Sequence, residues 1–243
     1  MRSPIHETRT NDVPFIQSTD VLMISIIGRR NSANVQKVMW TVGELGIQYE
    51  REDMGGSFGF SDAYSMLNPN QVVPTLCDGD LSLWESNACV RYLARTYGEG
   101  SLWPNDRRTL ALADQWMEWQ RSDISNAFFP LFQNKIKFSA DEINVDQITA
   151  SAAQCMRLYG QLDRHLEQHA YLAGDEFTMG DIPLGTITYR YMNLDIERVE
   201  LPHVRAWYER LCERPAYRYH VMIPFGTNPD EWLREEINNA NLQ

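Results

Sequence analysis

The chain has 243 residues, of which 43% are hydrophobic, and carries a formal net charge of −11. This length allows one large domain or two modest ones, each with a real core. The acidic balance argues against a nucleic-acid partner, because phosphate binding needs a basic surface. No apolar run approaches the roughly 20 residues of a membrane helix, and no apolar secretory segment opens the chain. We therefore expect a cytoplasmic protein with no membrane partner.

Residues 1–20 are polar, contain two prolines, and are expected to form a flexible arm. The next eighty residues alternate strand and helix patterns. Strands are expected at 21–28, at 47–53 and on both sides of the turn at 78–80, and helices at 35–45, 61–67 and 86–98. The expected order is β-α-β-α-β-β-α, and Gly46 follows the first helix where a helix typically ends.

The stretch at 98–108 interrupts this pattern with glycine, proline and charge, so we place a linker at 99–106. No convincing strand pattern follows it. Pro130 is expected to kink or end the first helix beyond the linker. Helices are expected at 107–138, 145–169, 179–193, 203–212 and 215–222, followed by a polar tail after Pro224 with apolar anchors such as Trp232. The chain thus divides into an α/β domain at 21–98 and an all-helical domain at 107–243.

The stretch NPNQVVPTL, at 68–76, places a proline between a loop and a strand. An X-Pro bond lowers the cost of the cis form to about 0.5–1 kcal/mol. A cis peptide before Pro74 would turn the backbone of Val73 outward, where it can pair with an extended peptide. A trans proline at the start of a strand is the alternative.

The stretch WESNACVRYLA, at 84–94, begins a helix with Glu85 and Ser86. Ser86 is expected to cap that helix. A helix N-terminus suits a carboxylate, and the neighbouring Glu85 can receive an ammonium group. Together they would bind the head of an amino acid. The alternative is a simple cap beside a solvated carboxylate.

The stretch GRRNSANVQKVMW, at 28–40, places Asn31, Ser32 and Asn34 at the mouth of another helix. A hydroxyl or amide there can donate a hydrogen bond to a thiolate. A helix N-terminus also lowers the pKa of a thiol below its free value of about 8.5. These groups would therefore keep a bound thiol ionised near neutral pH. The alternative is that they only cap the helix.

The four cysteines form no CxxC pair and have no metal-like spacing with histidine. We expect reduced thiols, with Cys77 or Cys89 as the alternative candidates for a reactive one. His165 and His169 share a helix face without further ligands nearby in sequence. The sequence therefore predicts no metal site.

These motifs together resemble the soluble glutathione transferase family over residues 21–223, with a pattern similar to its theta, delta, phi and nu classes. VVPTL resembles the family's cis-proline loop, and ESNACVRYLA resembles its glutathione-binding serine and following helix. FTMGDI, in which Thr178 and Asp181 form a capping box, resembles the motif that begins its core C-terminal helix. The resemblance implies a thioredoxin-like N-terminal domain followed by an all-helical C-terminal domain, glutathione as co-substrate, and a homodimer.

The resemblance also implies roles for single residues. The backbone of Val73, before Pro74, would pair with the cysteinyl part of glutathione, and Glu85 and Ser86 would hold its γ-glutamyl end. Relatives often carry Lys or Gln where this chain has Val72, and Gln71 is expected to substitute for it. Asn31 is a further expected glutathione contact. The electrophile pocket would lie between the domains and be lined by Trp116, Trp119 and Phe128, for which packing in the core is the alternative.

Two alignments of the first helix compete. SANVQKV resembles the delta and phi pattern, in which Ser32 would activate the thiol for attack on an apolar electrophile. NVQKV resembles nu-type members, in which Asn34 would serve in reduction of disulfides or peroxides. We favour Ser32 and conjugation. A non-catalytic binding or scaffold protein with the same fold is the alternative from another class.

Overall fold

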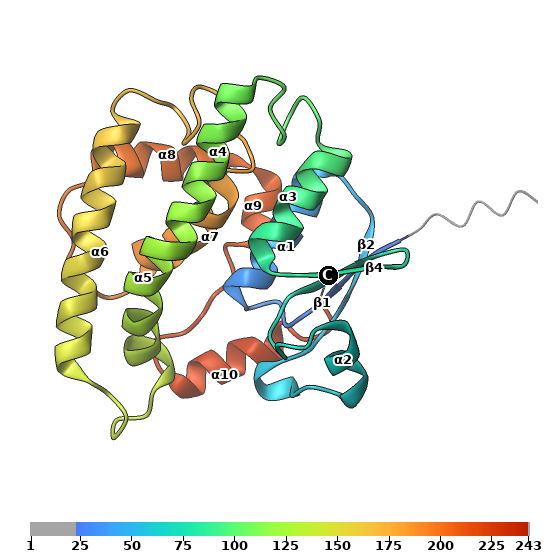
Figure 1. Cartoon of the computed structure of the whole chain (residues 1–243). Helices are drawn as coiled ribbons and strands as arrows, with labels where there is room; N and C mark the ends of the chain where they lie inside the picture. Colours follow the sequence, from blue (N-terminus) through green and yellow to red (C-terminus); the bar gives the residue numbers. More distant parts are fainter. Residues whose placement is uncertain (1–22, 243) are drawn as a thin grey trace, which may run out of the picture.

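The computed structural model describes residues 23–242. The flexible arm expected at 1–20 lies outside these residues. Figure 1 shows a small sheet with its helices beside a larger bundle of helices. Strands β1 (Ile24–Ile27) and β2 (Tyr49–Glu52) are parallel, whereas β3 (Thr75–Asp78) and β4 (Leu81–Trp84) are antiparallel neighbours, and the strand order is β2-β1-β3-β4. This mixed sheet and its crossovers confirm the expected order of elements.

Helices α1 (Ala33–Leu45) and α3 (Ser86–Tyr97) pack on the sheet, and the short α2 (Asp62–Leu67) follows the turn η1 (Gly56–Phe58). Apolar residues from α1, α3 and the strands share one buried cluster. α1 ends where the sequence indicated, because Gly46 takes a left-handed conformation with φ of 64° and its N–H donates to Gly43.

The sequence left open a cis or a trans peptide bond before Pro74. In the structure the Val73–Pro74 bond is cis. Two side chains hold the loop in place, one from α2 and one from the residue that follows α2. The Tyr64 hydroxyl and the Asn68 amide donate to the Val72 carbonyl at 2.6 and 2.7 Å. The backbone ahead of Pro74 is therefore fixed by buried polar groups.

The rest of the chain is helical. Its elements are α4 (Arg107–Trp119), the π-helical η2 (Gln120–Ile124), α5 (Ser125–Phe132), the π-helical η3 (Gln133–Lys137), α6 (Val145–Leu166), α7 (Asp181–Asn193), α8 (Pro202–Glu213), α9 (Pro215–His220) and α10 (Pro229–Asn238). None of the helices within residues 23–242 has the length and apolar character to cross a bilayer.

Two features of the helical part add to what the sequence indicated. Of the two outcomes expected at Pro130, the helix does not end there, because wider π-helical turns precede and follow α5 and the backbone stays helical at Gln120 and Gln133. The polar tail contains a helix, α10, that was not expected. Asn228 caps α10 through its side chain, and Trp232 is 9% exposed.

Helix α1 lies between the two parts of the fold (Figure 1). Its Trp40 packs edge-on against Tyr217 of α9, with 4.6 Å between ring centroids. Its Glu44 accepts two hydrogen bonds from Arg214, at 2.9 and 2.6 Å. The side of α1 that carries Trp40 and Glu44 therefore faces the helical part.

Candidate functional site

The N-terminus of α1 opens onto a cavity of about 160 Å³. Ser32 stands at the N-cap position with an extended backbone, but its hydroxyl makes no capping hydrogen bond. The side chain lines the cavity instead. The positive end of the α1 dipole points to the same place. The cavity is lined by Arg29, Ser32, Ala33, Asn34, Phe129, Phe132, Gln133, Lys137, Arg190 and Trp232.

Asn34 also lines this cavity, and a chain of polar contacts holds it from behind. The Ser86 hydroxyl donates to Asn34 Oδ1 at 3.2 Å. Lys37 Nζ in turn donates to Ser86 Oγ at 3.3 Å, and also to Asn87 Oδ1 and Gln120 Oε1 at 3.1 and 3.2 Å. Because its oxygen is engaged, the Asn34 amide has its nitrogen left to donate elsewhere.

Lys37 is a functional candidate that the sequence did not indicate. Its side chain is buried, and burial lowers the pKa of the ammonium to about 7, although the charge of Glu85 opposes this effect. Three neutral oxygens surround it in place of a carboxylate. Lys37 thus connects the start of α3 to the start of α1.

The start of α3 differs from the expectation in one respect. Ser86 is the first helical residue and not the cap, because its hydroxyl is turned toward Asn34 and Lys37. Glu85 takes the cap position with φ of 70° and makes no capping bond through its side chain. Its carboxylate is exposed. It is therefore free to receive a cationic group.

The cis-proline loop approaches the same region from the sheet. A Cβ on Gly28 would lie 2.5 Å from Val35 Cγ2 and 3.0 Å from Val73 Cβ. Only a glycine at this position lets the loop lie so close to the start of α1. Gln71 is exposed, with φ of 49°. Val73 and the mouth of α1 are therefore neighbours, as the motifs suggested.

Asn31 does not line the cavity. Its side chain is 2% exposed, and both polar atoms are buried without a hydrogen-bond partner among residues 23–242. Its carbonyl accepts a hydrogen bond from Arg190 Nη2 at 2.5 Å. Asn31 is therefore a buried residue next to Ser32 that connects the start of α1 to α7 through Arg190.

The three aromatic residues expected in the electrophile pocket lie elsewhere. Phe128 is fully buried and packs against Phe132, with 5.6 Å between ring centroids. Trp116 packs between Trp119 and His165. None of the three lines the cavity beside Ser32. The aromatic residues that do are Phe129, Phe132 and Trp232.

Helical spacing offered a signal for part of this correction. Phe129 and Phe132 of α5 and Gln133 of η3 stand at positions i, i+3 and i+4, so they share one face of this continuous helical stretch, which turns to the cavity. Lys137 continues the same face one turn later. Arg29, Arg190 and Trp232 come from distant segments, and no local pattern connects them.

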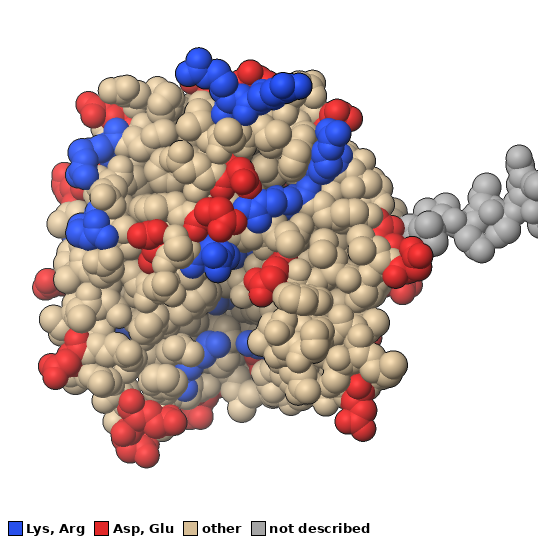
Figure 2. Space-filling view, in the orientation of Figure 1, with Lys and Arg blue, Asp and Glu red and all other residues tan. Residues whose placement is uncertain are grey.

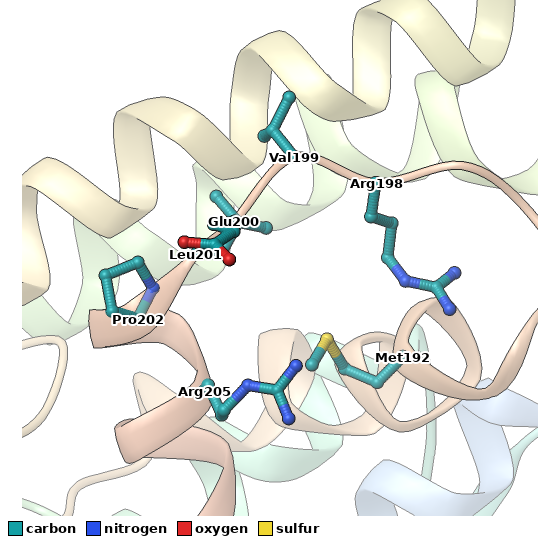
Figure 3. A pocket seen from close by; sticks show the side chains of 7 residues that line it. All are labelled: Met192, Arg198, Val199, Glu200, Leu201, Pro202 and Arg205. Atoms are coloured by element: carbon teal, nitrogen blue, oxygen red, sulfur yellow. The ribbon is translucent and has the colours of Figure 1, made fainter.

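A larger hollow of about 450 Å³ lies between the end of α7 and the start of α8. Figure 3 shows the side chains of Arg198, Glu200 and Arg205 around it. It contains no residue from the mouth of α1, the cis-proline loop or the start of α3. Of these two cavities, only the smaller one contains residues from a sequence motif, namely those at the mouth of α1.

The histidines, cysteines and acidic residues form neither a metal site nor a reactive thiol pair within residues 23–242. Within residues 23–242, no group of three or more histidine, cysteine or acidic side chains is arranged to hold a metal ion. The four cysteines are free. Cys89 is fully buried, and burial raises the pKa of its thiol to about 12, which makes it unreactive at neutral pH.

Known protein families match both parts of the chain. Residues 26–95 match the glutathione S-transferase N-terminal domain, and residues 124–215 match the glutathione S-transferase C-terminal domain. The chain is 40% identical over 206 residues to glutathione S-transferase GstB of Escherichia coli strain K12, which covers 83% of this chain and 99% of that protein.

Solved structures agree with these matches. A theta-class glutathione S-transferase from Xanthomonas axonopodis pv. citri, with glutathione bound, is 46% identical with a TM-score of 0.81, covering 84% of this chain and 99% of that one. Glutathione S-transferase I from mais, in complex with an atrazine glutathione conjugate, is 24% identical with a TM-score of 0.73, covering 84% of this chain and 100% of that one. The latter likeness concerns the fold alone.

Proposed function

The chain belongs to the glutathione S-transferase family, and from this premise we propose that Ser32 holds the thiol of glutathione in its ionised form. The observation that carries the proposal is the Ser32 hydroxyl, which lines the cavity and makes no capping bond. A hydrogen bond to a charged acceptor contributes about 1.5–3 kcal/mol. The α1 dipole adds to this stabilisation.

The geometry around α1 supports the remaining proposed contacts with glutathione. Glu85 would receive the γ-glutamyl ammonium, while Ser86 and the N-terminus of α3 would receive the adjoining carboxylate. The backbone of Val73, held by the cis bond to Pro74, would pair with the cysteinyl unit. Gln71 would contact the glycine end. In this assignment the domain at 21–98 binds glutathione.

The all-helical domain at 107–243 would then supply the second substrate site. Phe129, Phe132 and Trp232 offer apolar faces on the cavity beside Ser32. The thiolate forms a C–S bond with an electrophilic carbon, the leaving group departs with its electron pair, and the thiol proton passes to solvent. Rate enhancement comes from thiolate stabilisation and from proximity of the two substrates.

Reduction of disulfides through Asn34 is the second candidate. Its supporting observation is the hydrogen bond from Ser86 to Asn34 Oδ1, which leaves the Asn34 nitrogen able to donate into the cavity. A thiolate so held would attack a disulfide sulfur. The two functions use neighbouring donors on the first turn of α1, so substitution of each distinguishes them.

The test measures two reactions with glutathione: conjugation of 1-chloro-2,4-dinitrobenzene and reduction of a mixed disulfide. We expect Ser32→Ala to lower kcat/KM for conjugation by roughly tenfold to a hundredfold, as the loss of one charged hydrogen bond predicts. The pKa of bound glutathione, followed as thiolate absorbance, should rise in the same variant.

Ser101→Ala is the matched control, since this exposed serine lies in a turn away from the cavity. If Asn34→Ala abolishes both activities while Ser32→Ala leaves them intact, Asn34 is the thiol donor and the assignment to Ser32 is wrong. If the wild type shows neither activity and no affinity for glutathione, the non-catalytic binding or scaffold alternative is favoured.

We also propose a homodimer that acts in the cytoplasm. Several large apolar side chains are exposed around α2 and β4, with Met66 at 89%. Covering them against a second copy would remove apolar surface from water. The four free cysteines suit a reducing compartment. The apolar residues are Phe60, Met66, Leu67, Val72 and Trp84.

A further inference from the structure

Three cationic side chains surround the cavity beside Ser32. They are Arg29, Lys137 and Arg190, which come from the β1–α1 connection, η3 and α7. Figure 2 shows Lys and Arg atoms at the bottom of a hollow, low in the centre of the view. The chain as a whole carries a net charge of −11. The cavity is therefore locally positive in a protein that is acidic overall.

Only one of the three cations has an acidic partner in the described part of the chain. Arg29 Nε lies 2.7 Å from Glu236 Oε2 of α10. Glu236 is itself engaged, because its Oε1 accepts the Ser57 N–H at 2.8 Å. The Glu236 carboxylate, which does not line the cavity, is therefore already engaged by Arg29 and Ser57.

Arg190 is bound only to neutral groups within residues 23–242. Its Nη2 donates to the Asn31 carbonyl at 2.5 Å and to Gln36 Oε1 at 3.2 Å. The residue is 4% exposed, and its guanidinium lies 5.1 Å from the centroid of the Phe132 ring. Arginine is rarely buried without a counter-charge, so this site is electrostatically incomplete.

Lys137 likewise has no acidic partner within residues 23–242. Its Nζ is 4.2 Å from the centroid of the Trp232 ring, and no ion pair to it is found among residues 23–242. Burial, followed by the charges of Arg190 and Arg29, lowers the pKa of Lys137 to about 8, although the charge of Glu236 opposes this effect. Burial and Arg29 likewise lower the pKa of Arg190 to about 9. The cations repel one another, and a bound anion would relieve that repulsion.

The position of the cluster indicates which substrate brings the anion. In the proposed function the carboxylates of glutathione lie toward Ser86 and Gln71, on the side of the sheet. Lys137 and Arg190 belong to η3 and α7, on the helical side, together with the aromatic faces. The cations therefore lie where the second substrate would bind.

The dimensions of the cavity limit the size of that substrate. A cavity of about 150 Å³ accommodates one benzene ring, and this one has about 160 Å³. Its walls combine aromatic faces with two cations that lack acidic partners in the described chain. A carboxylate on a ring of that size would reach Lys137 or Arg190 while the ring lies against Phe132 or Trp232.

We propose that the second substrate is an electrophile with a carboxylate group, bound through Lys137 and Arg190. This inference rests on the proposed function. With an aryl halide, the glutathione thiolate bonds to the ring carbon that bears chlorine. The C–Cl bond breaks and chloride leaves with the bonding pair. The carboxylate takes no part in the bond changes and positions the ring.

The test compares 4-chloro-3-nitrobenzoate with 4-chloro-3-nitrobenzamide, which differ in charge but hardly in shape. Each kcat/KM is divided by the rate constant of the uncatalysed reaction with glutathione. We expect the wild type to prefer the benzoate by roughly tenfold to a hundredfold, the effect of one charged hydrogen bond. Lys137→Gln should remove most of this preference.

Lys135→Gln is the matched control, because this lysine lies on the same turn of η3 but does not line the cavity. It should keep the preference of the wild type. Arg190→Gln is a second test, to be read only if its circular dichroism matches the wild type. An equal rate for benzoate and benzamide in the wild type would overturn the proposal.

Further measurements separate this proposal from its rivals. If Lys137→Gln raises the KM for glutathione equally with all electrophiles, the cluster binds a glutathione carboxylate and the proposal is wrong. Turnover of 1-chloro-2,4-dinitrobenzene reports the proposed function independently of the cluster. Calorimetric titration with 3-nitrobenzoate tests the cavity without turnover, and we expect binding by the wild type that is roughly tenfold weaker in Lys137→Gln. Absence of binding would contradict the proposal.

Discussion

Lys37 lies behind the proposed glutathione site, and no carboxylate is hydrogen-bonded to its ammonium within the described residues. Its three hydrogen-bond partners are neutral oxygens of Ser86, Asn87 and Gln120. These bonds orient the Ser86 hydroxyl toward Asn34. We infer that Lys37 positions the first turns of α1 and α3 relative to each other without contacting glutathione.

This burial gives the stability of the protein a predictable dependence on pH. The pKa of Lys37 is about 7 in the folded protein, against an ordinary value of 10.5. Between these values the unfolded chain binds more protons, so the contribution of Lys37 to the free energy of unfolding rises as the pH increases from about 7 to 10. Lys37→Met removes this contribution.

Urea denaturation at pH 7 and at pH 9 measures the effect. The free energy of unfolding of the wild type, minus that of Lys37→Met, should be larger at pH 9. Lys135→Met, with its partly exposed lysine, serves as the control. If the free energy of unfolding depended on pH in the same way in the wild type and in Lys37→Met, burial would not lower the pKa of Lys37.

The site was predictable from sequence only where its residues form local motifs. Ser32 and Asn34 were both candidates, because each stands at the start of a helical pattern, and both line the cavity. Their spacing does not tell which hydroxyl or amide faces the cavity, since that depends on Ser86, 52 residues away. Lys137 and Arg190 were missed because their meeting is a consequence of tertiary packing.

Helix α7 begins at a buried carboxylate that joins three segments. Asp181 Oδ2 accepts the Thr178 N–H at 3.0 Å, as the capping box predicts. Asp181 Oδ1 accepts the Leu172 N–H at 3.0 Å and Trp207 Nε1 at 2.9 Å. The residue is fully buried. It therefore fixes the start of α7 against α8 as well as capping it.

We expect Asp181→Ala to lower the free energy of unfolding by roughly 3–9 kcal/mol. The substitution leaves three buried donors without an acceptor, and each costs about 1–3 kcal/mol. Thr178→Val removes the bond that its hydroxyl accepts from Gly180 N–H and the long bond that it donates to Asp181 Oδ2, and should cost about 1 kcal/mol. Urea denaturation gives both values. Equal losses in the two variants would contradict a joining role for Asp181.

The helices and strands were largely predictable, and the exceptions have physical causes. Periodic apolar residues located α1, α3 and α6, and Gly46 located the end of α1. α10 was missed because its buried residues, Trp232 and Glu236, include a charged one. Its Asn228 cap and the Pro229 that follows were a usable signal.

The two parts of the molecule are joined through α1, which contributes to both clusters of the core. Val35 and Val38 belong to the cluster under the sheet, whereas Ala33 and Trp40 belong to the helical cluster. Helices α7 and α9 contact α1 directly. Loss of the helical part would expose one face of α1, so we expect neither part to unfold alone.

The pair of Glu44 and Arg214 tests this coupling. Arg214 contacts both oxygens of Glu44, whose side chain is 10% exposed and which also accepts Trp40 Nε1 at 2.7 Å. A two-point pair that is partly buried should have a coupling energy of about 1–2 kcal/mol in a double-mutant cycle of Glu44→Ala and Arg214→Ala. Glu209→Ala with Arg205→Ala, on α8, is the control cycle and should give a coupling near zero.

Cooperativity is then read from two signals at one protein concentration. Tryptophan fluorescence reports mainly the helical part, where Trp207 is buried, and far-ultraviolet circular dichroism reports the whole chain. The two urea transitions should coincide in the wild type and move together in both single variants. If α1 did not couple the parts, Glu44→Ala would separate the curves, with the helical part unfolding at an unchanged midpoint. A single shifted transition means that the cavity between the parts exists only when both are folded.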